Sequence, residues 1–119
     1  MTGVQTCALP IHLKAFDAEL GKSANADVKA IRASLAAGAA AVVDCVDFIV
    51  ANAGKDLLGT FAGAVPFLKL MGITTGGWQM ARAALVATRQ LGAGEGDAAF
   101  LDAKITTARF FAEIGRAHV

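Results

Sequence analysis

A stripe of apolar and small residues between residues 28 and 49 constrains the fold of this chain more than any other feature. Its members recur at alternating intervals of three and four positions, as Val28, Ile31, Leu35, Gly38, Val42, Cys45 and Ile49. This spacing follows one face of an α-helix for about six turns. Asn25 is a predicted N-cap, and Asn52-Ala53-Gly54 is a predicted stop. The stripe therefore predicts one long amphipathic helix, in which Gly38 allows another helix to approach closely.

Helical signals also lie on both sides of this stripe. Residues 12–20 carry apolar side chains at helical spacing, and Gly21–Asn25 ends that piece. Gly92–Gly96 predicts a turn, after which Asp97 caps a last helix. The candidate core positions of the last helix are Phe100, Ile105, Ala108 and Phe111, while Asp102, Lys104 and Arg109 are expected at the surface or in ion pairs.

The fold class follows from composition and periodicity together. Alanine, the best helix former, dominates the sequence, and no segment alternates with the period of two that marks a strand. We therefore expect an all-α protein, folded as a small up-down helical bundle of about three to four helices.

Residues 55–91 form the most apolar region. Leu57, Phe61, Val65 and Leu68 share one helical face, and Lys69 and Arg82 are the only charges between residues 57 and 88. Pro66 predicts a kink or a new helix start nearby, because proline lacks the backbone N–H of a helix interior. Trp78 is the one large aromatic anchor. A helix that is apolar nearly all round is predicted to be buried or covered by a partner.

Charge and cysteine content exclude several classes of protein. The chain carries a formal net charge of +1, and removing Arg116 with the C-terminal segment leaves ten basic against ten acidic side chains. This balance predicts no nucleic-acid partner and no anionic membrane surface. The uncharged runs are shorter than the roughly 18–20 residues of a spanning helix, so no transmembrane segment is expected. Cys45 would be the only native cysteine, which favours a reducing, cytoplasmic location.

Both ends of the chain are predicted to be foreign to the domain. Thr6–Ile11 can be written as ACG TGT GCT CTT CCG ATC, and the reverse complement of that string, in another frame, encodes Ile114–His118. One short DNA element, similar to a sequencing-library adapter, therefore explains both ends in opposite orientations. We interpret residues 1–11 and 114–119 as adapter-derived artefacts and residues 12–113 as the domain.

Each residue cluster with possible chemistry has a simpler packing explanation. Gly92–Gly96 superficially resembles a phosphate loop, but a helix precedes it and Glu95 would repel phosphate. Asp44 and Asp47 share a helix face without the histidine that paired metal sites in bundles use. Cys45 lies on the apolar stripe and is expected to be a small packing residue.

Trp78 with Gly76-Gly77 could line an acyl or adenine pocket, although helix packing is the preferred interpretation. The isolated basic residues Lys69, Arg82 and Arg89 could contact a phosphate or a subunit but are expected to be solvated. We expect no catalytic, cofactor-binding or metal-binding residue in this chain.

Two segments resemble a known family. The first runs from Gly63 to Ala84 and reads GAVPFLKLMGITTGGWQMARAA. The second comprises Gly94–Phe100, Ala103-Lys104 and Ala108–Glu113. Together they resemble the C-terminal "acetyl-CoA dehydrogenase-like" domain found in a branch of the acyl-CoA dehydrogenases that includes enzymes acting on 3-methylmercaptopropionyl-CoA. The resemblance covers most of residues 12–113 and is weak before Asn25.

The resemblance implies that this chain is part of a larger enzyme and does not imply a catalytic site within the chain. Family members use FAD to oxidise an acyl-CoA thioester to its 2,3-enoyl form, with a glutamate base in the core that precedes this domain. No residue here matches that base, so FAD is expected in the parent enzyme and not in this fragment. The implied partners are the catalytic core, a second subunit and, for the parent, an acyl-CoA substrate. The alternative is a stand-alone helical interaction domain without enzyme activity.

Overall fold

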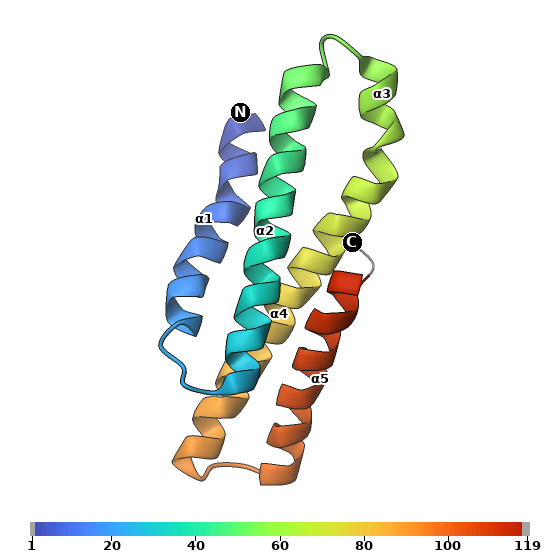
Figure 1. Cartoon of the computed structure of the whole chain (residues 1–119). Coiled ribbons are helices and arrows are strands. Elements are labelled where there is room, and N and C mark those ends of the chain that lie inside the picture. The colour runs from blue at the N-terminus through green and yellow to red at the C-terminus, as the bar shows by residue number, and fades with distance from the viewer. Residues whose placement is uncertain (1, 118–119) are drawn as a thin grey trace.

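The computed structural model describes the backbone of residues 2–117 and the side chains of residues 11–114. Its elements are α1 (Thr2–Leu20), α2 (Ala26–Asn52), α3 (Leu57–Ala62), α4 (Ala64–Ala93) and α5 (Ala98–Ala117). The four long helices run alternately up and down, and α3 is a short piece between α2 and α4 (Figure 1). The all-α bundle predicted from the sequence is therefore confirmed for the described residues, with α3 as a fifth, six-residue helix.

The predicted helix ends are confirmed by their hydrogen bonds. Asn25 Oδ1 accepts from the backbone N–H groups of Asp27 at 2.8 Å and Val28 at 3.2 Å, so it caps α2. Asp97 Oδ1 accepts from the N–H of Ala99 at 3.0 Å and starts α5 in the same way. Gly94 ends α4 with a φ of 72°, a left-handed conformation that glycine adopts without strain.

Pro66 marks the start of a helix rather than a kink within one. It lies in the first turn of α4, where the first N–H groups have no intrahelical acceptor, so its missing N–H costs no hydrogen bond. Asp56 caps the preceding α3 by accepting from the N–H of Gly59 at 2.9 Å. The apolar segment that follows α2 therefore enters α4 through a short separate helix.

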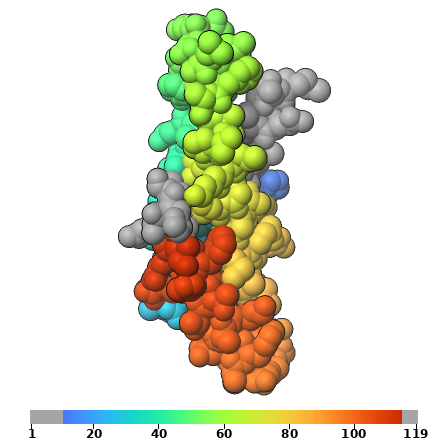
Figure 2. Space-filling view, turned by 90° about the vertical axis from the view of Figure 1, so that its right-hand side faces the viewer, coloured from blue at the N-terminus to red at the C-terminus, as the bar shows by residue number. Residues whose placement is uncertain are grey.

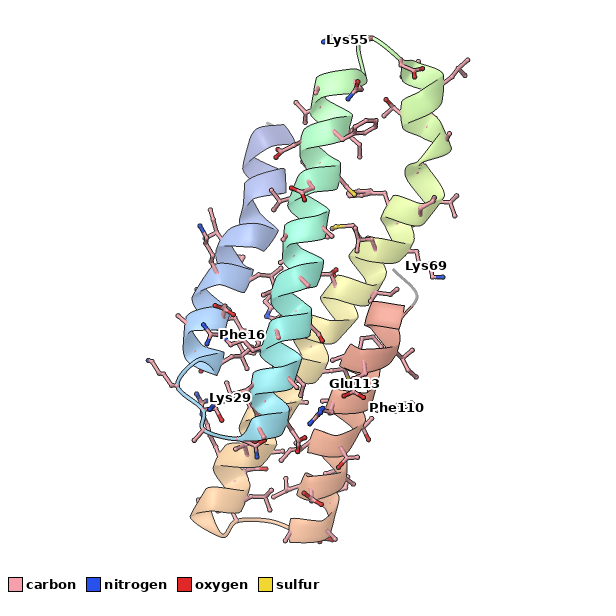
Figure 3. All side chains as sticks on the ribbon, in the orientation of Figure 1. Phe16, Lys29, Lys55, Lys69, Phe110 and Glu113 are labelled. Atoms are coloured by element: carbon pink, nitrogen blue, oxygen red, sulfur yellow. The ribbon has the colours of Figure 1, made fainter. Side chains whose placement is uncertain are left out.

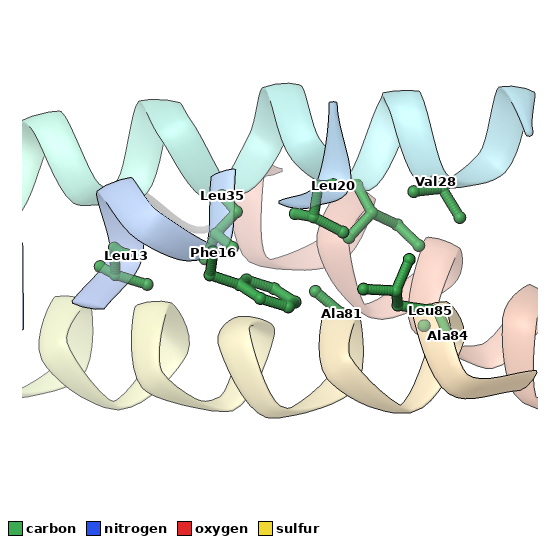
Figure 4. Close-up of a cluster of buried hydrophobic side chains, with 10 residues drawn as sticks. Leu13, Phe16, Leu20, Val28, Leu35, Ala81, Ala84 and Leu85 are labelled. Atoms are coloured by element: carbon green, nitrogen blue, oxygen red, sulfur yellow. The ribbon is translucent and has the colours of Figure 1, made fainter. Parts of the chain in front are cut away.

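The core joins α1, α2, α4 and α5 in the half of the bundle where the α1–α2 and α4–α5 turns lie (Figure 1). Its buried members are Leu13, Phe16, Leu20, Val28, Ile31, Leu35, Ala81, Ala84, Leu85 and Ala108, most of which are labelled in Figure 4. A second buried cluster packs α4 against α5 and consists of Ala87, Leu101 and Ile105. The alanines of α4 bring its backbone close to its neighbours, because they place only a methyl group in the interface.

One predicted core position of the last helix is wrong. Phe100 is 58% exposed, whereas its neighbour Leu101 is buried. The face of α5 that meets α4 follows the spacing of Leu101, Ile105 and Ala108, and one residue corresponds to a rotation of about 100° around a helix. Phe100 instead lies beside Lys104, whose Nζ is 5.3 Å from the centroid of the ring.

The opposite end of the bundle has no buried residue. Between Val42 and Leu70, none of the side chains is buried. We call residues 43–69 the hairpin end: it comprises the last part of α2, all of α3 and the start of α4, and it extends beyond α5 in Figure 2. Leu57, Phe61, Val65 and Leu68 are exposed, so they are not buried within this chain. The end of α2 faces this segment across an open groove and does not cover it. Of the two predicted alternatives, a covering partner is the one that agrees with the structure.

By length and composition alone, one helix in the described part of the chain could cross a membrane. The most apolar 18-residue window of α2 has a mean hydropathy of 1.8. Asp44 and Asp47 interrupt the uncharged run of α2. The length of uncharged runs, which was the only criterion applied to the sequence, therefore did not identify α2 as a candidate membrane helix. The core helix of a soluble protein meets the same test, so the finding is weak evidence for a membrane.

Ion pairs join the helices on the core side of the bundle. Arg32 of α2 contacts Asp17 of α1 through two hydrogen bonds, Nε to Oδ1 at 2.9 Å and Nη2 to Oδ2 at 3.0 Å. Arg89 of α4 donates to Glu19 of α1, and Arg109 of α5 donates to Asp27 of α2, each at 2.6 Å. Such half-exposed pairs contribute little energy but fix which residues face each other.

The pair between Asp17 and Arg32 gives a prediction about acid stability. The hydrogen bonds and the charge of Arg32 hold the pKa of Asp17 below its ordinary value of 3.8. A carboxyl with a lowered pKa in the folded state stabilises the fold above its unfolded pKa, and this stabilisation is lost as pH falls through the folded pKa. As the pH is lowered below about 4, we expect the free energy of unfolding to decrease in the unsubstituted chain. In Asp17→Asn we expect this decrease to be less steep. Equal slopes in urea titrations at several acidic pH values would contradict this.

Candidate functional site

The glycine-rich segment at residues 92–96 forms a turn between α4 and α5. The N–H of Gly94 donates to the carbonyl of Leu91 at 3.2 Å, and the N–H of Glu95 donates to that of Gln90 at 2.9 Å. These two bonds cap the last carbonyl groups of α4, a role typical of glycine at a helix end. The structure therefore agrees with a helix–helix turn and not with a phosphate loop.

The acidic and thiol candidates lie at the hairpin end of α2. Asp44 and Asp47 are both exposed, and Cys45 is half-buried and free. The described residues contain no group of three or more His, Cys, Asp or Glu side chains that could hold a metal ion. The interpretation of Asp44 and Asp47 as a solvated face agrees with this geometry.

Trp78 packs against the core from α4. Its ring is stacked on His12 of α1, with 6.4 Å between the ring centroids and 19° between the planes. Phe111 of α5 covers the adjacent Gly76, where an added Cβ would meet the Phe111 ring at 3.0 Å. This close approach of Phe111 to α4 agrees with the helix-packing interpretation of Trp78 and the two glycines.

The basic candidates do not converge on one point. Arg89 is paired with Glu19, and Arg82 donates to Gln79 of its own helix at 3.4 Å. Lys69 extends away from the bundle at the hairpin end (Figure 3). Because the three side chains lie on separate parts of the surface, they form no phosphate-binding cluster.

A small hollow lies where α2, α4 and α5 meet. Its volume is about 150 Å³, and it is lined by apolar residues with the hydroxyl-bearing Ser34 and Thr74 among them. Thr74 is 96% buried, since only 4% of its surface is exposed, and its Oγ1 has no hydrogen-bond partner. Thr74 follows Leu70 by four residues and precedes Gly77 by three, so its place on the inner face of α4 could have been predicted from spacing alone.

The unpartnered hydroxyl of Thr74 gives a stability prediction. A buried polar group without a partner costs about 1–3 kcal/mol, and valine has nearly the same shape as threonine. We expect Thr74→Val to raise the free energy of unfolding by about 1 kcal/mol. The matched control is Thr88→Val on the same helix, because Thr88 Oγ1 donates to the carbonyl of Ala84 at 2.8 Å and should not gain. A loss of stability in Thr74→Val would show that the hydroxyl has a partner in solution.

The hairpin end is a further candidate for a functional surface. A groove of about 700 Å³ separates the end of α2 from α3 and the start of α4, and its apolar lining includes Phe48, Ile49, Val65 and Phe67. Helical spacing in the sequence placed Ile49 and Val65 of this lining on apolar helix faces but did not single out Phe48 or Phe67. Periodicity shows which face of a helix is apolar and not what covers it. The groove could therefore be found only from the structure.

These features define a class: an all-α domain whose core occupies one end and whose other end is apolar and unburied. The chain belongs to the family described as "Acetyl-CoA dehydrogenase C-terminal like", whose model matches residues 5–114. It is similar to the 3-methylmercaptopropionyl-CoA dehydrogenase of Ruegeria pomeroyi, with 43% identity over 101 residues. No solved structure matches the chain.

The match covers 85% of this chain but only 17% of the relative, so the chain spans about a sixth of that protein's length. The family match begins at residue 5 and overlaps part of the segment interpreted as an adapter artefact. The division into residues 1–11, 12–113 and 114–119 stays a prediction.

Proposed function

We propose that this chain is the C-terminal helical domain of an FAD-dependent acyl-CoA dehydrogenase and that it has a structural role. The parent enzyme would oxidise an acyl-CoA thioester to its 2,3-enoyl form in the cytoplasm, with FAD and all catalytic residues supplied by the rest of the polypeptide. The observation that carries the structural role is the hairpin end, where 27 consecutive residues between Val42 and Leu70 include none that is buried. Such a surface is suited to packing against another protein surface.

The described residues do not fit FAD. The hollow beside Thr74, at about 150 Å³, is smaller than the roughly 300–1,000 Å³ of ligand pockets. The groove of about 670 Å³ between α1 and α2 is large enough by volume, but Asp17, Asp44 and Asp47 line it against one lysine, Lys14. The groove at the hairpin end is also large enough, and its charged lining residues are Asp44 and Lys69, which leaves no excess of positive charge. A carboxylate there would repel the diphosphate of FAD. No step of the reaction is therefore assigned to this domain.

The structural role is tested by removing residues 12–113 from the full-length enzyme. We expect the shortened enzyme to keep its FAD per subunit but to melt at a lower temperature or to lose its native subunit association. In parallel, titration of the 119-residue chain with FAD should leave the flavin fluorescence unchanged. Tight FAD binding by this chain would overturn the proposal, whether or not the shortened enzyme folds.

Sequencing the source DNA across His12 and Glu113 separates the two candidate functions. A reading frame that continues upstream into a flavin-binding core supports the dehydrogenase domain. A frame that starts and stops at these positions supports the stand-alone helical interaction domain and overturns the proposal.

A further inference from the structure

The surface of this domain is divided into two regions of different chemistry. The interhelix ion pairs Asp17–Arg32, Glu19–Arg89 and Asp27–Arg109 all lie in the region of the core. Of the thirteen large apolar side chains exposed in the described part of the chain, eight lie between residues 43 and 68. They are Val43, Phe48, Val50, Leu57, Leu58, Phe61, Val65 and Leu68. The apolar excess therefore belongs to the hairpin end and not to the surface as a whole.

The hairpin end offers both a groove and protruding side chains. The groove between the two arms is lined on one side by Phe48 and Ile49 of α2 and on the other by Val65 and Phe67. Phe61 of α3 is 64% exposed and Leu68 of α4 is 72% exposed. In Figure 3 Lys55 lies at the tip of this end, while Lys69 extends outward lower on α4. Lys69 and Asp44 form part of the groove lining beside its apolar residues. Clustered aromatic and aliphatic anchors with charges at the edge are the usual composition of a binding surface.

The length of the relative outside the matched region favours one occupant for this surface. The domain corresponds to 17% of the relative's length, so most of such a protein is available to cover the hairpin end. A segment of the same polypeptide is held near the domain at high effective concentration, whereas a second copy must be recruited from solution. In addition, α1 runs from the side of the hairpin end toward the opposite end (Figure 1). Protein that precedes His12 therefore approaches the domain from the side of its apolar surface.

We propose that the hairpin end is the docking surface for the catalytic portion of the same polypeptide, and that an apolar segment of that portion fills the groove between α2 and α4. This inference rests on the proposed function and adds which face of the domain is used. Phe61, Val65 and Leu68 are the central contacts, and the exposed faces of α1 and α5 around the ion pairs stay in solvent.

A photo-cross-linking experiment on the full-length enzyme tests the docking surface. Phe61 and Phe110 are a matched pair of phenylalanines, 64% and 62% exposed, the first at the hairpin end and the second on α5. Each is replaced in turn by p-benzoylphenylalanine, which is close to phenylalanine in shape and inserts into neighbouring C–H bonds on illumination. We expect position 61 to give an intramolecular cross-link to the catalytic portion, identified by peptide mass spectrometry, and position 110 to give none.

The other results distinguish the docking surface from the proposed function. Cross-links from position 110 and none from position 61 overturn the docking surface but still support a domain that packs on its own enzyme. Subunit-to-subunit cross-links at position 61 overturn the choice of occupant and assign the groove to a second copy. No cross-link from either position overturns both the docking surface and the packing role.

A pair of charge substitutions gives an independent measurement. Leu68 and Val86 are both on α4, at the hairpin end and in the core half respectively, and both are exposed. In the full-length enzyme we expect Leu68→Glu to lower the melting temperature by several degrees and Val86→Glu to leave it nearly unchanged. In the 119-residue chain neither substitution should matter. Equal effects of the two substitutions in the enzyme overturn the docking surface.

Discussion

Replacing Leu20 by alanine is expected to lower the free energy of unfolding of this chain by about 3 kcal/mol. Leu20 is 1% exposed and ends α1 inside the main core cluster, beside Val28 and Leu85 in Figure 4. Truncation removes buried methyl groups and leaves a cavity, because the packed side chains around Leu20 can relax only partially into the space. Since small domains are stable by only about 5–15 kcal/mol, this loss is a large part of the total.

The matched control for this substitution is Leu58→Ala. Leu58 is 83% exposed on α3, so the same chemical change removes little buried surface, and we expect an effect within about 0.5 kcal/mol. Urea unfolding followed by circular dichroism measures both variants, with unchanged m-values as the sign that the comparison is valid. Similar decreases in the free energy of unfolding for Leu20→Ala and Leu58→Ala would contradict the position of the core in the structure.

Replacing Gly38 by leucine is expected to cost about 3 kcal/mol, the upper part of the range for overpacking. Gly38 lies on α2 opposite Thr74 of α4, and an added Cβ would be only 3.0 Å from Thr74 Oγ1. The hollow that Gly38 and Thr74 line can take part of a leucine side chain, but the Cβ atom still meets Thr74 Oγ1, so α2 and α4 must shift apart at this point. That movement would also disturb the contact of Leu35 with the core, three residues earlier on α2.

Gly72→Leu is the control, because an added Cβ at Gly72 of α4 meets no atom within 4 Å. Leucine is a better helix former than glycine by up to about 1 kcal/mol, so this variant should be slightly more stable than the parent chain. The measured quantity is the difference in the melting temperature between the two leucine variants. If both variants gain stability, the close approach of α2 and α4 at Gly38 does not exist in solution.

Local signals made the helix ends predictable from the sequence. Asn25 and Asp97 precede helices and accept from their first N–H groups, while Gly94 permits the left-handed conformation that ends α4. These features depend on residues within a few positions of each other, so sequence is sufficient for them. The same holds for the family assignment, because it rests on contiguous segments of the chain.

Burial was harder to predict because it depends on which helix lies opposite. Phe100 and Leu101 are adjacent and both apolar, and only the rotation of α5 against α4 decides that Leu101 is the buried one. Phe61 and Leu85 also have similar hydrophobicity, yet Leu85 is buried in the main core cluster while Phe61 is 64% exposed on α3. The candidate docking surface is therefore a property of helix lengths and positions that periodicity does not contain.

The continuity of α2 and α4 through both regions of the bundle has a consequence for their backbone amides. Amide hydrogens near Ile31 and Leu85 are protected by the core and exchange with solvent only when the bundle opens as a whole. Amides near Phe48 and Leu68 are held by helix hydrogen bonds alone, so local fraying is sufficient for their exchange. Each of these two helices is therefore continuous but is more stable against opening in the core half than at the hairpin end. The boundary between the two regions lies at Val42 in α2 and at Leu70 in α4.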